Sequence, residues 1–183
     1  MSKENADKEQ KRSFKREVFS WIACIVVTIL LTEFILNFVI INANIPSGSM
    51  ENTIMTNDKL IALRTSYWFN DPKRGDIIIF KYPDDETEWF IKRVIALPGE
   101  TVLVKDGKVY INGSKKALSE PYIKEEPVED FGPYKVPMNG YFVMGYNRNN
   151  SNDAREWETH YVSRDEVLGK AWFRYYPSIK VIK

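Results

Sequence analysis

The sequence predicts a mainly β protein, an antiparallel coiled sheet or barrel, preceded by one membrane-spanning helix. Two observations lead to this fold class. A long apolar segment lies near the N-terminus, and after residue 45 short apolar and aromatic runs alternate with Gly and Pro turns. Helical periodicity is weak in that later part, so we expect almost no helix there.

The apolar segment runs from Val18 to Ile41 and is long enough to cross a hydrocarbon layer of about 30 Å as a helix. Basic residues gather before it, within residues 11–16, whereas no cation follows it before Lys59. We therefore expect a single-pass protein of the cell membrane, and the charge asymmetry predicts that its N-terminus is cytoplasmic and the remainder lies outside. Residues 1–17 would form a cytoplasmic tail, residues 18–41 the anchor and residues 42–183 an extracytoplasmic β domain.

A cleaved signal peptide is the alternative interpretation of this segment. The stretch exceeds the usual apolar region of about 7–15 residues, and the only A-x-A-like site, Ile41-Asn42-Ala43, begins with a bulky residue. An uncleaved anchor is therefore favoured. Glu33 lies inside the span, where an acid is costly; a protonated group, a contact with a partner helix and a tolerated acid without function all remain open.

The rest of the chain divides into strands separated by turns. Asp106-Gly107 is a strong hairpin signal, and Ser163–Leu168 could form one short helical turn. Residues 114–137 are rich in charge and proline, so we expect an extended surface excursion there. The expected strands are Lys59–Arg64, Gly75–Tyr82, Trp89–Leu97, Thr101–Lys105, Lys108–Ile111, Gly140–Gly145 and Lys170–Tyr176.

Composition excludes several functions. The net charge is +1 and no long basic stripe follows residue 45, so nucleic acid is not an expected partner. Cys24 is the single cysteine, which rules out an intramolecular disulfide. No cluster of Cys and His could hold zinc, and we expect neither a metal nor a cofactor.

Ser49 is a candidate nucleophile because of its place in the chain. It follows Ile41 so closely that even an extended linker reaches only roughly 25–30 Å, so its chemistry would occur near the bilayer surface. A serine hydroxyl needs an adjacent base. His160 is the only histidine and lies in a polar stretch without a motif, so we expect an ordinary surface residue. Pro46 replaces the first Gly of a G-x-S-x-G elbow.

A lysine is the natural alternative base, provided that burial keeps it neutral. Along the expected strand around Lys92, alternation places this lysine in an apolar stripe with Phe90 and Val94. Arg93 lies on the opposite face with Ile95 and cannot act as a base. The other interpretation is a lysine whose stem packs while its ammonium reaches water.

Three motifs follow one another along the chain: Pro46–Met50 (PSGSM), Phe90–Glu100 (FIKRVIALPGE) and Gly145–Arg155 (GYNRNNSNDAR). Together they resemble the conserved boxes of the type I signal peptidases. The first is similar to the serine box of that family, the second to its lysine box, and the third to a box usually written G-D-N-R-x-N-S-x-D-S-R. Asp76 also matches a strand entry of the family. The short spacing of the boxes resembles the compact Gram-positive branch.

The resemblance implies roles for individual residues. Ser49 would be the nucleophile and Lys92 the general base. The side chain of Ser47 and the backbone N–H of Ser49 would form the oxyanion hole, and Ser151 would orient the amine of Lys92.

Asp153 and Arg155 would form a supporting ion pair, and the third box shows two departures beside them. Tyr146 stands where the family has Asp, and Ala154 stands where it has Ser. Tyr keeps a hydroxyl but supplies no negative charge at neutral pH.

The implied function is a membrane-anchored serine endopeptidase that removes signal peptides from exported preproteins at the lipid bilayer. The alternative is a catalytically weakened relative that binds preproteins or assists another signal peptidase. A Ser-Lys peptidase related to self-cleaving repressors would need a regulatory segment, and residues 1–17 are only a short charged tail. The aromatic loop 66–70 could enter the headgroup region or fold onto the core. Candidate walls of shallow substrate pockets are Met50, Ile77, Ile79, Ile91 and Ile95.

Overall fold

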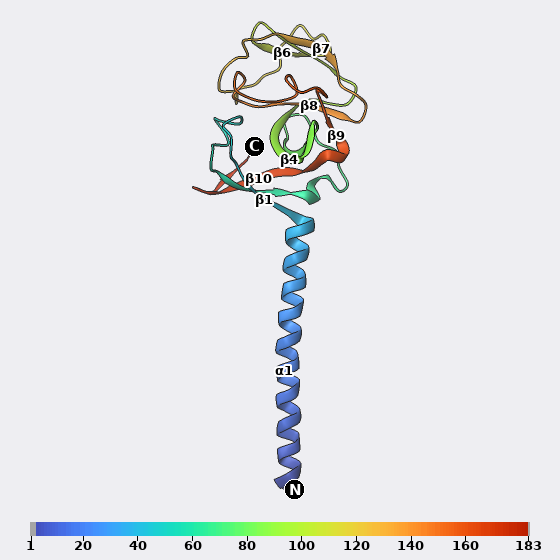
Figure 1. The fold of residues 1–183 in the computed structure, drawn as a ribbon, viewed down its shortest axis with the longest axis vertical. Coiled ribbons are helices and arrows are strands. Elements are labelled where there is room, and N and C mark those ends of the chain that lie inside the picture. The colour runs from blue at the N-terminus through green and yellow to red at the C-terminus, as the bar shows by residue number, and fades with distance from the viewer. Residues whose placement is uncertain (1–2, 183) are drawn as a thin grey trace. The chain divides into compact units, whose positions relative to one another are not determined.

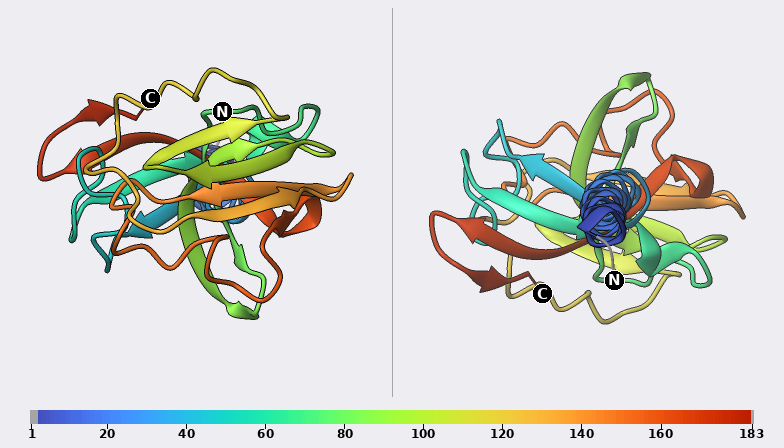
Figure 2. Two further views of the ribbon diagram at one scale, coloured as in Figure 1. Left: turned by 90° about the horizontal axis from the view of Figure 1, so that it is seen from above. Right: turned by 90° about the horizontal axis from the view of Figure 1, so that it is seen from below.

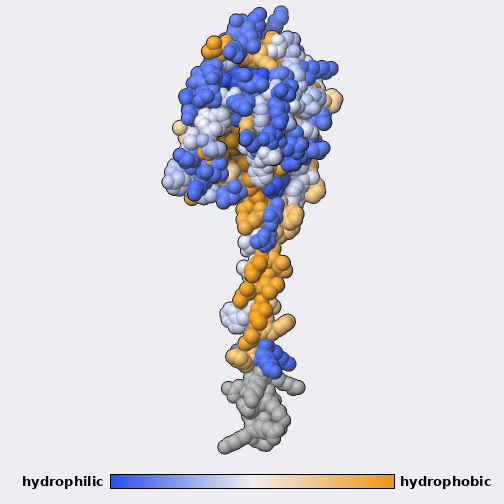
Figure 3. Space-filling model, viewed as in Figure 1, coloured by the Kyte–Doolittle hydropathy of each residue, from blue (hydrophilic) through white to orange (hydrophobic). Residues whose placement is uncertain are grey.

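The computed structural model describes residues 3–182, and the chain divides into two compact units between Val39 and Ile40. The first unit is helical, with α1 (Lys3–Phe34) continuing into a π-helical turn, η1 (Ile35–Val39). From Phe14 to Val39 this unit is largely apolar, and these residues form its mostly orange stretch in the hydropathy colouring of Figure 3.

The membrane-spanning candidate within this unit is Phe14–Val39, with 26 residues and no buried side chain in its apolar window. At the usual rise per residue it is about 39 Å long, enough to span a bilayer. Glu33 accepts a hydrogen bond from Asn37 Nδ2 at 3.0 Å. Ile40 and Ile41, which we expected in the helix, belong instead to the first strand of the second unit.

The second unit is built from antiparallel strands. Their bounds are β1 (Ile40–Asn44), β2 (Lys59–Leu63), β3 (Ile77–Tyr82), β4 (Asp85–Ala96), β5 (Thr101–Lys105), β6 (Lys108–Ile111), β7 (Phe131–Lys135), β8 (Gly140–Met144), β9 (Val162–Ser163), β10 (Val167–Tyr176) and β11 (Lys180–Val181). The larger, 8-stranded sheet has the order β1-β2-β10-β3-β4-β8-β9, with β11 paired to β10, and β6-β5-β7 form a second sheet. Figure 1 shows β4 curling through the unit. The predicted mainly β fold is confirmed as an open, coiled sheet.

Each strand expected from the sequence is present. The turn joining β3 and β4 stands away from the rest of the unit in both views of Figure 2. A missed strand, β7, lies inside residues 114–137, where we expected only a surface excursion. It pairs with β5, and Phe131 and Tyr134 pack against the core. The charges and prolines of the surrounding segment hid these two aromatic anchors.

Two apolar cores lie on the two faces of β3 and β4. Ile78 and Phe80 belong to one core, and Ile77 and Ile79 belong to the other, as alternation requires. Ile95 differs from expectation because it packs in the first core together with its neighbour Val94.

The reason is a β-bulge between Val94 and Ala96 in the pairing of β4 with β8. A bulge adds a residue to one strand and shifts the alternation beyond it. Lys92 precedes the bulge, so its face is the one that alternation predicted.

Two shorter features connect the strands. The predicted turn after Ser163 is confirmed as the 3-10 helix η3 (Arg164–Glu166) with a capping box. The aromatic loop is divided: Tyr67 is buried and donates to Asp76, whereas Trp68 and Phe69 are exposed.

Candidate active site

Ser49 lies in a tight turn that follows β1. The amide of Glu51 donates to the Gly48 carbonyl at 3.1 Å. Met50 and Ile54, which follow Ser49, are 0% and 1% exposed and pack in the second core. These two anchors hold the turn in place and leave Ser49 itself 7% exposed.

The third box forms the loop that closes over this turn. The backbone amides of Tyr146 and Asn147 donate to the Ser49 carbonyl at 2.9 and 3.1 Å. A Cβ atom at Gly145 would lie 2.5 Å from that same carbonyl oxygen. Only glycine permits this close approach, which explains the first residue of the box.

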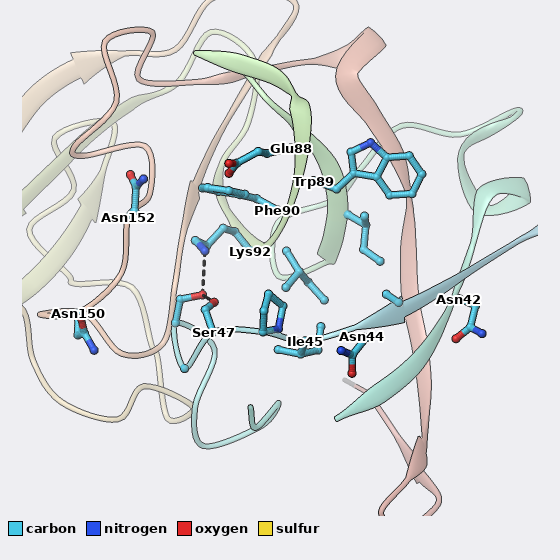
Figure 4. Close-up of a pocket in the computed structure, with 16 residues that line it drawn as sticks. Asn42, Asn44, Ile45, Ser47, Glu88, Trp89, Phe90, Lys92, Asn150 and Asn152 are labelled. Carbon is cyan, nitrogen blue, oxygen red and sulfur yellow. Dashed lines mark hydrogen bonds between the residues drawn. The ribbon is translucent and has the colours of Figure 1, made fainter. Parts of the chain in front are cut away.

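Lys92 reaches the serine from β4. Its Nζ donates to Ser49 Oγ at 2.8 Å, the contact drawn as a dashed line in Figure 4. The lysine is 3% exposed, and its Nζ lies 5.1 Å from the centre of the Phe90 ring. Burial lowers the pKa of Lys92 to about 8, and the nearby carboxylate of Asp153 opposes this shift. A neutral amine in this position could accept the proton of the Ser49 hydroxyl.

Ser47 and Ser151 lie on either side of this pair. Ser47 Oγ is 3.4 Å from Ser49 Oγ. Ser151 is 8% exposed, and its Oγ has no hydrogen-bond partner among residues 3–182. The expected hydrogen bond from Ser151 to the amine of Lys92 is therefore not formed in this structure.

Asp153 and Arg155 form a two-point ion pair. Arg155 Nε and Nη2 donate to the two carboxylate oxygens of Asp153 at 2.9 and 3.0 Å. The same carboxylate accepts the Gly145 amide at 2.9 Å, and Arg155 Nη2 also donates to the Arg148 carbonyl at 2.6 Å. The pair thus closes the third-box loop on itself, beside the serine turn.

Tyr146, the first departure from the family pattern, is fully buried. Its hydroxyl accepts hydrogen bonds from Nε of Arg93, at 2.6 Å, and from Nη2. Burial raises the pKa of Tyr146, so the phenol stays neutral while it meets a charged partner. Ala154, the second departure, is 0% exposed in the first core, a place suited to a methyl group.

The sequence analysis missed one part of the site. A segment within residues 114–137, which we expected to lie on the surface, packs against the serine turn and the third-box loop. Arg148 Nη2 and Glu120 Oε1 pair at 2.6 Å, with side chains 0% and 6% exposed. The Lys124 amide donates to the Tyr146 carbonyl at 2.9 Å, and Asn52 Nδ2 donates to the Ile123 carbonyl at 3.1 Å. Arg148 inside the third box was the available signal, because a buried arginine needs hydrogen-bond acceptors and is commonly paired with a carboxylate.

His160 is not the ordinary surface residue that we expected. Its Nδ1 lies 2.8 Å from the Ala154 carbonyl, and its half-buried ring packs edge-on against Phe131 and Tyr134. These contacts give the histidine a structural role in the core.

A cavity of about 740 Å³ opens beside Ser49 and Lys92, between the β1 chain and β4. Ile79 and Ile91, two of the expected walls, line it. Met50 and Ile77 belong to the same second core as Ile79 and Ile91 but do not line the cavity, and Ile95 packs in the first core. The arrangement offers an extended chain a groove that passes a buried Ser-Lys contact.

Comparisons with known proteins identify the family of this chain. The family model described as "Signal peptidase, peptidase S26" matches residues 18–176. A probable signal peptidase I-2 of Synechocystis sp. is 43% identical over 161 residues, covering 85% of this chain and 72% of the relative. Signal peptidase I of Bacillus amyloliquefaciens is 34% identical over 185 residues, with 96% and 97% covered. A signal peptidase I crystal structure from Enterococcus faecalis, 35% identical, matches with a TM-score of 0.48 over 55% of this chain and 97% of that one. On the sequence matches, the chain belongs to the signal peptidase family, peptidase S26.

Proposed function

We propose that this protein is a membrane-anchored serine endopeptidase that removes signal peptides from exported preproteins with a Ser49–Lys92 dyad. The observation that carries the proposal is the 2.8 Å contact between Lys92 Nζ and Ser49 Oγ. Burial supports it further by lowering the pKa of Lys92 to about 8, so that a useful fraction of the amine is neutral near physiological pH.

In this mechanism neutral Lys92 accepts the hydroxyl proton while Ser49 Oγ attacks the carbonyl of the last signal-peptide residue. The lysine then gives that proton to the amine of the departing mature chain, and an acyl-enzyme remains on Ser49. Water, deprotonated by the same amine, releases the signal peptide. The Ser49 amide and the Ser47 hydroxyl donate to the oxyanion in each tetrahedral step.

Supporting roles fall to the third box. We assign to Ser151 the orientation of the Lys92 amine during catalysis, because its buried Oγ has no other partner in the described chain. The Asp153–Arg155 pair holds Gly145 against the serine turn.

The proposed topology places residues 1–17 in the cytoplasm, the apolar segment up to Val39 in the membrane, and the β unit, which begins at Ile40, outside. Signal-peptide-bearing preproteins and the lipid bilayer are then the partners. The basic residues before the apolar helix support this orientation.

The test uses the full chain in lipid vesicles with a purified preprotein, and compares it with Ser49→Ala and Lys92→Ala. Both variants should lose cleavage, whereas Lys81→Ala, which removes an exposed lysine paired with Glu86, should retain it. Cleavage that persists in both dyad variants would contradict the mechanism. If the unaltered protein binds the preprotein without cutting it, the weakened relative suggested by Tyr146 and Ala154 becomes the better description.

A further inference from the structure

The groove beside the dyad has two unlike ends. Toward β1 the lining combines apolar residues, among them Ile79 and Ile91, with the amides of Asn42 and Asn44, and none of these side chains is charged. The rest of the lining includes Asn150 and Asn152 of the third-box loop and Glu88 of β4, which lies beyond Phe90 in Figure 4. A bound chain that passes Ser49 and Lys92 would therefore move from an uncharged surface to one that carries a carboxylate.

Glu88 is the one carboxylate in the described lining of this groove, and Lys92 is the one other ionisable side chain there. It precedes Phe90 on the same face of β4, and the Phe90 ring lies between its carboxylate and Lys92 (Figure 4). Within residues 3–182 no hydrogen bond or ion pair engages Glu88, whereas neighbouring Glu86 pairs with Lys81 at 3.1 Å.

Another acidic neighbour shows what a structural role would look like here. Asp84 accepts hydrogen bonds from the amides of Glu158 and Thr159 and from the Thr159 hydroxyl, so its carboxylate holds a loop. Glu88 makes no comparable hydrogen bonds to a loop within the described chain. An exposed, uncompensated carboxylate at the end of a substrate groove leaves its charge available to whatever enters.

Chain connectivity and polarity decide which end receives which part of a preprotein. Asn42–Ile45 line the uncharged end, where Ile79 and Ile91 also lie, and they follow the last helical residue, Val39, within a few residues. A signal peptide also presents its cleavage site just beyond an apolar segment, and its last residues are small and apolar. The uncharged end with its two isoleucines therefore suits the signal peptide, and the Glu88 end receives the chain after the cut.

We propose that Glu88, with Asn150 and Asn152, forms a subsite for the first residues of the mature protein and favours a basic side chain there. This inference rests on the proposed peptidase function and adds a preference on the leaving side of the cut. Lys or Arg would pair with the Glu88 carboxylate, whereas Asp or Glu would be repelled.

The test uses peptides spanning a cleavage site that differ at one position only, carrying Lys, Gln or Glu at each of the first few residues after the cut. At low ionic strength the full-length enzyme should cleave the best-placed Lys peptide about fivefold better, in kcat/KM, than its Glu counterpart. About 0.5 M salt should reduce this ratio, because the pair is exposed. Glu88→Gln should bring the ratio to about one, and Glu88→Lys should reverse it.

Glu86→Gln is the matched control, since it removes a carboxylate of the same strand that already has a partner. It should keep the preference of the unaltered enzyme. The proposal is overturned if Glu88→Gln cleaves the peptides with an unchanged Lys-to-Glu ratio, or if the preference lies before the cut. Absence of cleavage of every peptide by the unaltered protein would instead refute the peptidase function, and this inference with it.

Discussion

Lys92 and Arg93 are adjacent basic residues of β4 that meet opposite surroundings. Both are buried, with 3% and 7% of their surface exposed. Lys92 reaches one hydroxyl, on Ser49, and lies over the Phe90 ring. Arg93 donates to the Tyr146 hydroxyl and the Gly75 carbonyl, and its guanidinium lies 4.1 Å from the centre of the Tyr122 ring.

The comparison shows that similar burial has different consequences for a lysine and for an arginine. An ammonium that loses water can shed its proton, and burial lowers the pKa of Lys92 to about 8. A guanidinium keeps its proton in proteins and must be given acceptors and aromatic faces instead. Alternation along one strand thus separates a candidate base from a structural cation.

The largest effect on cleavage should come from replacing Lys92, the candidate base, with an arginine like its neighbour Arg93. Lys92→Arg should lower cleavage by at least about 100-fold, because a guanidinium cannot accept the Ser49 proton. It should also destabilise the fold by roughly 3 kcal/mol, since the buried guanidinium cannot lose its charge and the nearby carboxylate of Asp153 is already paired with Arg155. Preprotein cleavage and urea unfolding measure the two effects. Near-normal cleavage by Lys92→Arg would eliminate Lys92 as the base.

The pH dependence of cleavage should follow the neutral fraction of Lys92. With its pKa at about 8, activity should rise as the pH increases through that value and level off above it. At pH 6 it should be about one-hundredth of the plateau. Initial rates of cleavage by the unaltered enzyme and by Lys81→Ala should trace the same curve. A flat profile from acid to alkaline pH is the contradictory outcome.

Stability should reveal the cost of burying the lysine. The pKa of Lys92 is lower in the folded chain than its ordinary value of 10.5, so the unfolded chain binds more protons between about pH 8 and 10.5. The penalty is fully present below pH 8 and disappears as the pH rises toward 10.5. Lys92→Met should therefore raise the unfolding free energy at pH 7 by about 2 kcal/mol, even though it abolishes cleavage.

Chemical unfolding of Lys92→Met at pH 7 and at about pH 10 gives the comparison, and the advantage of the variant should shrink at the higher pH. A variant less stable than the unaltered protein at pH 7 would mean that packing of the lysine stem outweighs the charge penalty.

The smallest expected effects are losses of unfolding free energy on changing the tyrosines that surround Arg93. Tyr146→Phe removes the hydroxyl that accepts from Arg93 and should cost about 2 kcal/mol of unfolding free energy. Tyr122→Phe keeps the ring beside Arg93 and removes only a bond to Glu120, so we expect about 1 kcal/mol. Equal losses in thermal or urea unfolding would show that the Tyr146 hydroxyl has no special weight.

Much of the fold could be predicted from local patterns. The apolar helix, the buried run of β3 and the hairpin around Asp106 depend on periodicity and turn chemistry that neighbouring residues supply. The missed strands β1 and β7 carry no such local signal. β1 begins directly after an apolar helix, and β7 lies between charged residues and prolines, so only pairing with β2 and β5 makes them strands.

The same distinction between local patterns and long-range contacts applies to the site. The motifs indicated Ser49 and Lys92, and alternation placed Lys92 on the apolar face. They did not reveal that Glu120 would be buried against Arg148, or that Ser151 Oγ would have no partner in the described chain. Those outcomes depend on how loops distant in sequence fold against each other.

By itself the sequence determined an N-terminal helix suited to a bilayer, a strand carrying a lysine in an apolar stripe, and a serine tethered close to that helix. Only the tertiary structure decided that Nζ of Lys92 meets Oγ of Ser49, 43 positions earlier in the chain, in a pocket dry enough to lower the pKa of the amine. The physical reason is that periodicity is a property of neighbouring residues, whereas desolvation is produced by every segment that packs around a group.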